Sequence, residues 1–155
     1  MASTSFSIST VLGVVEFGLQ RYNRIVGEKD RRPGGYLCIR NNDTGRIRLV
    51  SLVGNDSINK PNKRFEFSLE KGLRLLEKNK SLGHLSSWQS RDEATEKYPG
   101  AIIAGDYVLS FSGLPPLGDE ALMLRIGVQL GLLDRDAAKA IAKISDNLLF
   151  DEMAF

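Results

Sequence analysis

Few side chains in this sequence are of the types that carry out acid–base or nucleophilic chemistry near neutral pH. His84 is the only histidine and Cys38 the only cysteine. His84 is a candidate general base or axial metal ligand, or else an exposed loop histidine. Cys38 is expected to be a small buried apolar residue, because a reactive thiolate needs nearby cations or a helix N-terminus. One Cys and one His cannot assemble a tetrahedral zinc site of the usual kind.

Two adjacent carboxylates, Asp119 and Glu120, stand where a helix is expected to begin. They could act as paired acids, or they could simply place favourable negative charge at the helix N-terminus. An acidic cap occupies the N–H donors that would otherwise bind a phosphate. The preceding segment 113–118 is therefore not expected to be a phosphate loop, and the sequence contains neither a GxGxxG nor a Walker motif.

The distribution of charge weighs against a nucleic-acid partner. The formal net charge is only +2, with basic residues concentrated in 1–80 and acidic residues in excess in 81–155. Such a division could favour a polyanion or contact between two copies of the chain. No basic run exceeds two residues, however, whereas strong nucleic-acid binders present a denser stripe. A nucleic-acid partner is therefore not expected.

The composition predicts a cytoplasmic protein without a membrane partner. No apolar run approaches the ~20 residues that span a bilayer. The first basic residue is Arg21, after Glu16, whereas a secretory signal begins with a basic region. A lone cysteine can form no internal disulfide, which is the usual pattern of a reducing compartment.

The elements that would position the chemical groups follow from apolar spacing and turn-forming residues. Apolar residues at three- and four-residue spacing predict a helix over 8–26. Residues 36–40 and 46–53 predict two strands joined by a turn rich in Asn, Asp and Gly. Residues 63–80 predict a second helix, with Phe65, Leu69, Leu73 and Leu76 on one stripe. A short helix is expected near Ser90.

A second hairpin and two further helices are expected in the last third of the chain. Residues 101–104 and 107–112 are strand-like and are separated by a two-residue turn. We expect Asp119 to cap a helix that ends at Gly131. Asp134 is then expected to cap the last helix.

This order of elements predicts the fold class and the domain organisation. Helix, hairpin, helix, hairpin and helices predict an α+β domain in which helices flank an antiparallel sheet of about five strands, built from two hairpins. The 155 residues fit a single domain. We expect a flexible N-terminal tail over 1–7, one domain over 8–150, and a C-terminal tail over 151–155.

A motif between residues 105 and 121 adds a family resemblance to this pattern. Gly105-Asp106 leads through Tyr107–Phe111 to Ser112-Gly113 and then to Asp119-Glu120-Ala121. With the helix 8–26, the turn ending at Thr44-Gly45 and the helix 63–80, this run resembles the GlcG/HbpS-like domain family. That family includes haem-binding proteins and the C-terminal domain of some cobalamin adenosyltransferases. The resemblance implies an antiparallel sheet flanked by helices and a homodimer or larger homo-oligomer.

The resemblance also raises haem as a cofactor. Haem iron needs an axial His, Cys, Met or Tyr, and this chain offers His84, Cys38 and few others. A diverged member that retains the scaffold with a changed or lost ligand fits these residues better. No metal or required cofactor is therefore predicted.

The leading functional hypothesis is a non-enzymatic, self-associating domain that binds a small organic ligand or a protein partner. It rests on a complete fold pattern without a convergent set of titratable residues. We expect the ligand site at Ser112, Gly113, Asp119 and His84, with no catalytic residue. Two alternatives stay open: a haem- or tetrapyrrole-binding protein with degradative activity, and a small-metabolite enzyme that uses Asp119, Glu120 and His84.

Overall fold

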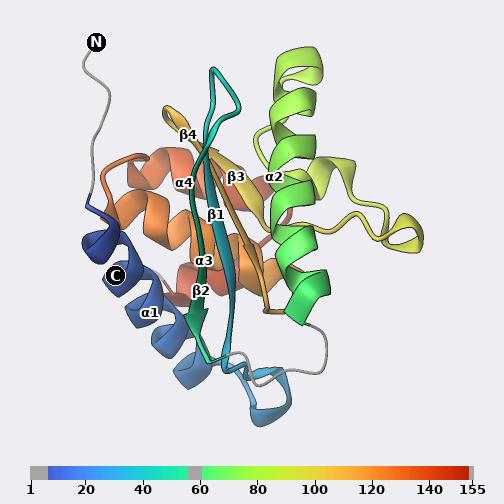
Figure 1. Cartoon of the computed structure of the whole chain (residues 1–155). Helices are drawn as coiled ribbons and strands as arrows, with labels where there is room; N and C mark the ends of the chain where they lie inside the picture. Colours follow the sequence, from blue (N-terminus) through green and yellow to red (C-terminus); the bar gives the residue numbers. More distant parts are fainter. Residues whose placement is uncertain (1–6, 56–60, 154–155) are drawn as a thin grey trace.

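The computed structural model describes residues 7–55 and 61–153, and its described residues form one antiparallel sheet between helices (Figure 1). The α+β class and the pairing of two hairpins are confirmed. The strand order is β2-β1-β4-β3. The first strand of one hairpin, β1, therefore pairs with the last strand of the other, β4, in the middle of the sheet. The strands are β1 (Gly34–Asn41), β2 (Ile47–Gly54), β3 (Ala101–Ala104) and β4 (Tyr107–Ser112).

The sheet has four strands in the described part of the chain, where about five were expected. Outside the named strands, Ser86 forms an isolated antiparallel bridge with Ile102. The Ser86 side chain accepts from the backbone N–H of Trp88, and the Gln89 side chain returns to the backbone N–H of Ser86. This capping box turns the chain into a 3-10 helix, so pairing beside β3 stops after one bridge.

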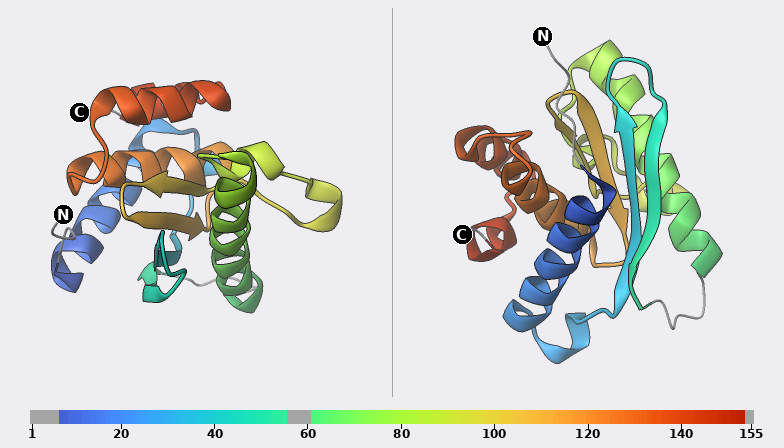
Figure 2. Two further views of the ribbon diagram at one scale, coloured as in Figure 1. Left: turned by 90° about the horizontal axis from the view of Figure 1, so that it is seen from above. Right: turned by 60° about the vertical axis from the view of Figure 1, so that its left-hand side comes forward.

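The helices cover the two faces of the sheet unequally (Figure 2). One face is covered by α2 alone, whereas α1 and α3 lie on the other face and α4 and α5 pack behind α3. Their bounds are α1 (Ile8–Ile25), α2 (Pro61–Leu82), α3 (Pro116–Gln129), α4 (Arg135–Ile144) and α5 (Leu148–Met153). The 3-10 helices η1 (Glu28–Asp30), η2 (Ser87–Ser90) and η3 (Glu93–Thr95) lie in the connections.

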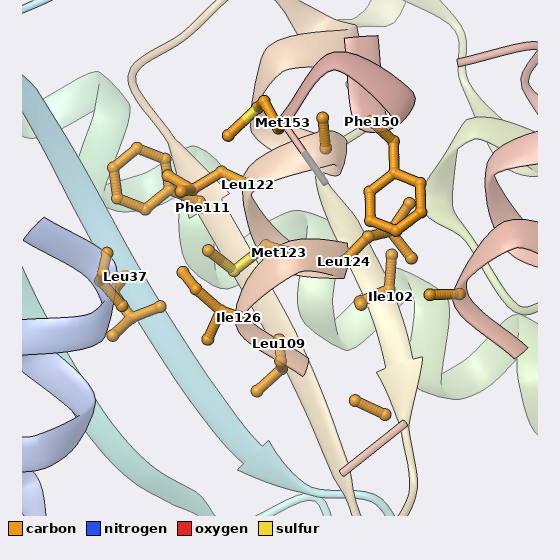
Figure 3. Packing of buried hydrophobic residues seen from close by; sticks show 14 of the residues in the cluster. Leu37, Ile102, Leu109, Phe111, Leu122, Met123, Leu124, Ile126, Phe150 and Met153 are labelled. Carbon is orange, nitrogen blue, oxygen red and sulfur yellow. The ribbon is translucent and has the colours of Figure 1, made fainter. Parts of the chain in front are cut away.

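The main apolar core lies between the sheet and the α1–α3 layer. Leu37 of β1, together with Leu109 and Phe111 of β4, points toward α3 (Figure 3). Met123 of α3 is fully buried among them. Successive strand residues point to opposite faces, so the residues between these apolar positions face α2.

The face beneath α2 carries both apolar and polar groups, and this corrects one sequence expectation in part. Leu76 is buried as part of an apolar cluster with Leu75, Ala101 and Val108. Phe65 and Leu73, assigned to the same stripe, are 39% and 44% exposed, and the buried side of the helix also carries Ser68, Lys71 and Arg74. The small residues Ser68 and Gly72 let this side of α2 lie close to the sheet, where a Cβ at Gly72 would stand 3.1 Å from Ser110 Oγ. Phe65 and Leu73 therefore lie partly outside the contact.

Three other boundaries differ from the sequence expectations. Helix α3 begins at Pro116, three residues before the expected Asp119 cap, because a proline fits the first helical turn, where N–H groups lack partners. The short helix expected near Ser90 is the pair η2 and η3. Residues 151–153 of the expected C-terminal tail belong to α5, whose Met153 is fully buried. Of the expected N-terminal tail, residues 1–6 lie outside the described residues.

Candidate functional site

A pocket lies where the end of β4 turns into α3, beside α2 and the segment that precedes β1. Its volume is about 480 Å³, which is within the size range of small-molecule sites. It is lined by Asp30, Arg32, Arg64, Phe67, Lys71, Tyr98, Ser112, Gly113, Leu114, Pro115, Pro116 and Asp119.

A buried ion pair between Lys71 and Asp119 forms part of this pocket. Lys71 Nζ lies 3.3 Å from Asp119 Oδ2, and the two side chains are 2% and 4% exposed. The Lys71 amine also donates to the carbonyl oxygen of Phe111 at 2.8 Å. Asp119 Oδ1 accepts from the backbone N–H of Leu114 at 2.8 Å. The pair therefore joins α2, the end of β4 and the start of α3.

Burial moves both members of this pair toward their neutral forms. Removal from water raises the pKa of Asp119 to about 6, although Lys71 and the backbone N–H groups of Leu114 and Gly113 oppose the shift. The same loss of water lowers the pKa of Lys71, against the opposing effect of Asp119. Transfer of one proton from Nζ to Oδ2 converts the charged pair into a neutral pair, and burial favours that transfer.

The lining of the pocket combines an aromatic pair with basic side chains. Phe67 and Tyr98 pack edge to face, with ring centroids 5.1 Å apart. Arg64 Nη1 is buried and has no hydrogen-bond partner in the described part of the chain. Arg32 Nη1 donates to backbone carbonyl oxygens at 2.9 Å. Among the described residues of the lining, the basic side chains, Lys71 included, outnumber the acidic ones by three to two.

Arg74 of α2 holds the backbone of Tyr98 in place. Its guanidinium donates to the carbonyl oxygen of Tyr98 at 2.6 Å and to the carbonyl and hydroxyl oxygens of Ser90 at 3.0 Å. Glu70 completes the arrangement with an ion pair at 2.9 Å. Backbone carbonyls in an irregular segment need such donors when they are buried. The aromatic wall is therefore tied to α2 rather than left as a free loop.

Three of the four predicted ligand residues lie together at this pocket: Ser112, Gly113 and Asp119. Gly113 has a packing reason to be glycine, because a Cβ there would stand 2.5 Å from the carbonyl oxygen of Gly34. Whether any of the three contacts a ligand stays a prediction.

His84 does not line this pocket. It follows α2, where its carbonyl oxygen accepts from Asn79 Nδ2 at 2.8 Å. Its Nδ1 is buried without a hydrogen-bond partner among the described residues. The expected grouping of His84 with the other three residues is therefore not found at the pocket.

Glu120 is directed away from Asp119, although the two are neighbours in sequence. It accepts hydrogen bonds from the hydroxyls of Ser86 and Ser145, and from Asn147 Nδ2 at 3.0 Å. Consecutive helical residues point about 100° apart, so adjacent carboxylates on α3 face different surroundings. The lining of the pocket includes Asp119 but neither Glu120 nor His84, so the three side chains of the enzyme hypothesis do not share it.

The sequence interpretation missed Arg64, Phe67 and Lys71. These residues lie at spacings of three and four on α2 and share one of its faces. The sequence feature that could have indicated this face is the pair of small residues Ser68 and Gly72, four positions apart, on the side of α2 that approaches the sheet. A Cβ at Gly72 would lie 3.1 Å from Ser110 Oγ.

Comparison of the chain with protein-family models, with curated proteins and with solved structures found no match. Among the described residues, no group of three or more His, Cys, Asp or Glu side chains could hold a metal ion.

The pocket does not fit a haem held by His or Cys. Within residues 7–55 and 61–153, Tyr98 is the only side chain of a haem-ligating type that lines it. Cys38 is fully buried within β1, and burial raises the pKa of its thiol.

No helix in residues 7–55 and 61–153 has the length and apolar character needed to cross a bilayer.

Proposed function

We propose that this protein binds a small organic anion in the pocket between α2, β4 and α3. The observation that carries the proposal is the buried Arg64 Nη1, which lacks a partner in the described structure and belongs to a residue that lines the pocket. A buried guanidinium N–H without an acceptor is unfavourable, and a ligand oxygen would satisfy it. Carboxylates match the planar donors of arginine especially well.

The rest of the lining supports an organic ligand over an inorganic ion. Phe67 and Tyr98 provide an aromatic wall, and Pro115 and Pro116 add apolar surface. Ligand sites combine such apolar surface with a few polar groups that fix orientation. A ligand with a carboxylate at one end and a short carbon body would use both parts of the lining.

The test is calorimetric titration with benzoate and, separately, with benzamide, which has the same shape without the charge. We expect saturable binding of benzoate and at least about tenfold weaker binding of benzamide. Arg64→Gln should weaken benzoate binding to a similar extent. Arg48→Gln is the matched control, because Arg48 is exposed on β2 and does not line the pocket. Equal effects of the two variants, or no saturable binding, would contradict the proposal.

We also propose that the protein self-associates, with a GlcG/HbpS-like scaffold as its architecture. Support comes from β2, which lies at one edge of the sheet and exposes Leu52 by 43%. Leu52 pairs with Tyr36, whose ring packs edge to face against the partly exposed ring of Phe65. Light scattering at increasing concentration tests this, and Leu52→Lys should lower the average mass. A wild-type protein that stays monomeric at high concentration would contradict it.

A further inference from the structure

The amine of Lys71 is placed for covalent chemistry that the proposed binding does not use. Lys71 is 1% exposed, yet it is part of the pocket lining. Among the described residues, Nζ has two acceptors, the Phe111 carbonyl oxygen and Asp119 Oδ2. An ammonium group donates three hydrogens, whereas a neutral amine donates two and keeps a lone pair. The surroundings therefore match the nucleophilic form of lysine.

We propose that Lys71 condenses with the carbonyl group of a small 2-oxo acid and holds it as a reversible imine. This inference rests on the proposed function, because Arg64 supplies the contact to the carboxylate of the same ligand. It narrows the ligand class from organic anions in general to those with a carbonyl next to the carboxylate.

The geometry of α2 brings the two groups to the same ligand. Arg64 and Lys71 are seven residues apart on one face, which corresponds to about 10.5 Å along the axis. Helical side chains lean toward the helix N-terminus, so Lys71 extends toward the turn that carries Phe67, on the side where Arg64 lies. Arg64 and Lys71 line the same pocket, so a molecule of a few carbon atoms beside Phe67 can contact both side chains.

Asp119 is placed to move the protons that the condensation requires. The Nζ lone pair forms a bond to the carbonyl carbon, and Asp119, which lies 3.3 Å from Nζ, carries one proton from the nitrogen to the carbonyl oxygen to give a carbinolamine. Asp119 then carries the second proton from the nitrogen to the hydroxyl group. That group leaves as water while the nitrogen lone pair completes the C=N bond. No oxidant or reductant is consumed.

Electrostatics support the same assignment. Burial lowers the pKa of Lys71, which increases the fraction of neutral amine, as in other imine-forming lysines. Burial also raises the pKa of Asp119 to about 6, near the range in which a carboxyl group both gives and accepts protons at neutral pH.

The test is trapping of the full chain with pyruvate and cyanoborohydride, followed by peptide mass mapping. We expect one dominant adduct, with the mass of the reduced imine, on the peptide that contains Lys71. Lactate has the same carboxylate without the carbonyl, so it should compete with trapping and form no adduct. Arg64→Gln should slow trapping at least about tenfold. Lys139→Met should not change it, because Lys139 is exposed on α4.

The outcomes separate this inference from the proposed function. If pyruvate and lactate bind but no adduct forms on Lys71, the imine is wrong and anion binding stands. If neither binds and no adduct forms, both proposals fail. Adducts spread over the exposed lysines, without saturation or competition by lactate, would also overturn the imine. Because the mapping locates the adduct in the wild-type chain, the test needs no substitution of the buried Lys71, which could disturb folding.

Discussion

The backbone of Gly100 packs against the amine of Lys71. A Cβ built on Gly100 would lie 2.9 Å from Lys71 Nζ, 2.9 Å from the Phe111 carbonyl oxygen and 2.7 Å from Asp119 Cβ. Gly100 also has a φ of 121°, a conformation that side-chain-bearing residues rarely adopt. The buried pair of Lys71 and Asp119 thus requires a residue without a side chain immediately before β3, and this contact connects the pocket to the sheet.

Gly100→Ala should therefore destabilise the protein by about 2–4 kcal/mol, because backbone strain and steric overlap act together. Urea unfolding, followed by circular dichroism, measures the change. Gly83→Ala is the matched control, since Gly83 also has a positive φ but a Cβ there meets nothing within 4 Å. It should cost only about 1–2 kcal/mol. Equal losses in the two variants would show that the contact with Lys71 and Asp119 carries no energy.

Removing one member of the buried pair should cost more than removing both. Lys71→Met leaves the carboxylate of Asp119 buried without its cation, and Asp119→Leu leaves the amine of Lys71 without its acid. Each single change should destabilise by about 3 kcal/mol or more, whereas the double variant should recover part of that loss. A double-mutant cycle of unfolding free energies measures the coupling. Additive losses would mean that the two groups do not interact.

The carboxyl group of Asp119 should titrate near pH 6 in the folded protein. Its ordinary pKa is 3.8, and burial raises it to about 6. The folded state therefore holds a proton over a range in which the unfolded state has lost it. A raised pKa contributes stability that is complete below about pH 4 and disappears as the pH rises through about 6.

Carbon NMR of the aspartate carboxyl groups measures this pKa, with Asp119→Asn identifying the resonance. Lys71 is the charged group that faces the carboxyl group, and the N–H groups of Gly113 and Leu114 also stabilise its ionised form. A midpoint near 3.8 would show that these opposing interactions cancel the effect of burial, and would contradict the prediction.

Glu120→Gln should destabilise the protein by about 1–3 kcal/mol. The carboxylate accepts from Ser86, Ser145 and Asn147, and an amide would place its own donor against one of these donors. Thermal and urea unfolding measure the loss. Glu77→Gln provides the control, because Glu77 is exposed on α2 and should change stability by less than about 0.5 kcal/mol. A Glu120 variant as stable as this control would contradict a structural role for the network.

Local sequence patterns were sufficient to predict the hairpins and several helix ends. Residues 101–104 and 107–112 form strands as expected, because a tight turn and alternating side chains are properties of neighbouring residues. Asp134 caps α4 as expected, because its side chain accepts a hydrogen bond from the backbone N–H three residues ahead. The same patterns placed Ser112, Gly113 and Asp119 at one end of the second hairpin, where the structure has its pocket.

The burial of Lys71, and with it the chemistry of the pocket, was decided by tertiary structure alone. Its partner Asp119 is 48 positions away, and no periodicity within either helix signals that they meet. The docking angle of α2 on the sheet turned a lysine inward and left Leu73 partly outside. Short-range patterns determine which residues form helices and strands, but the face that a helix buries depends on the shape and polarity of the surface beneath it.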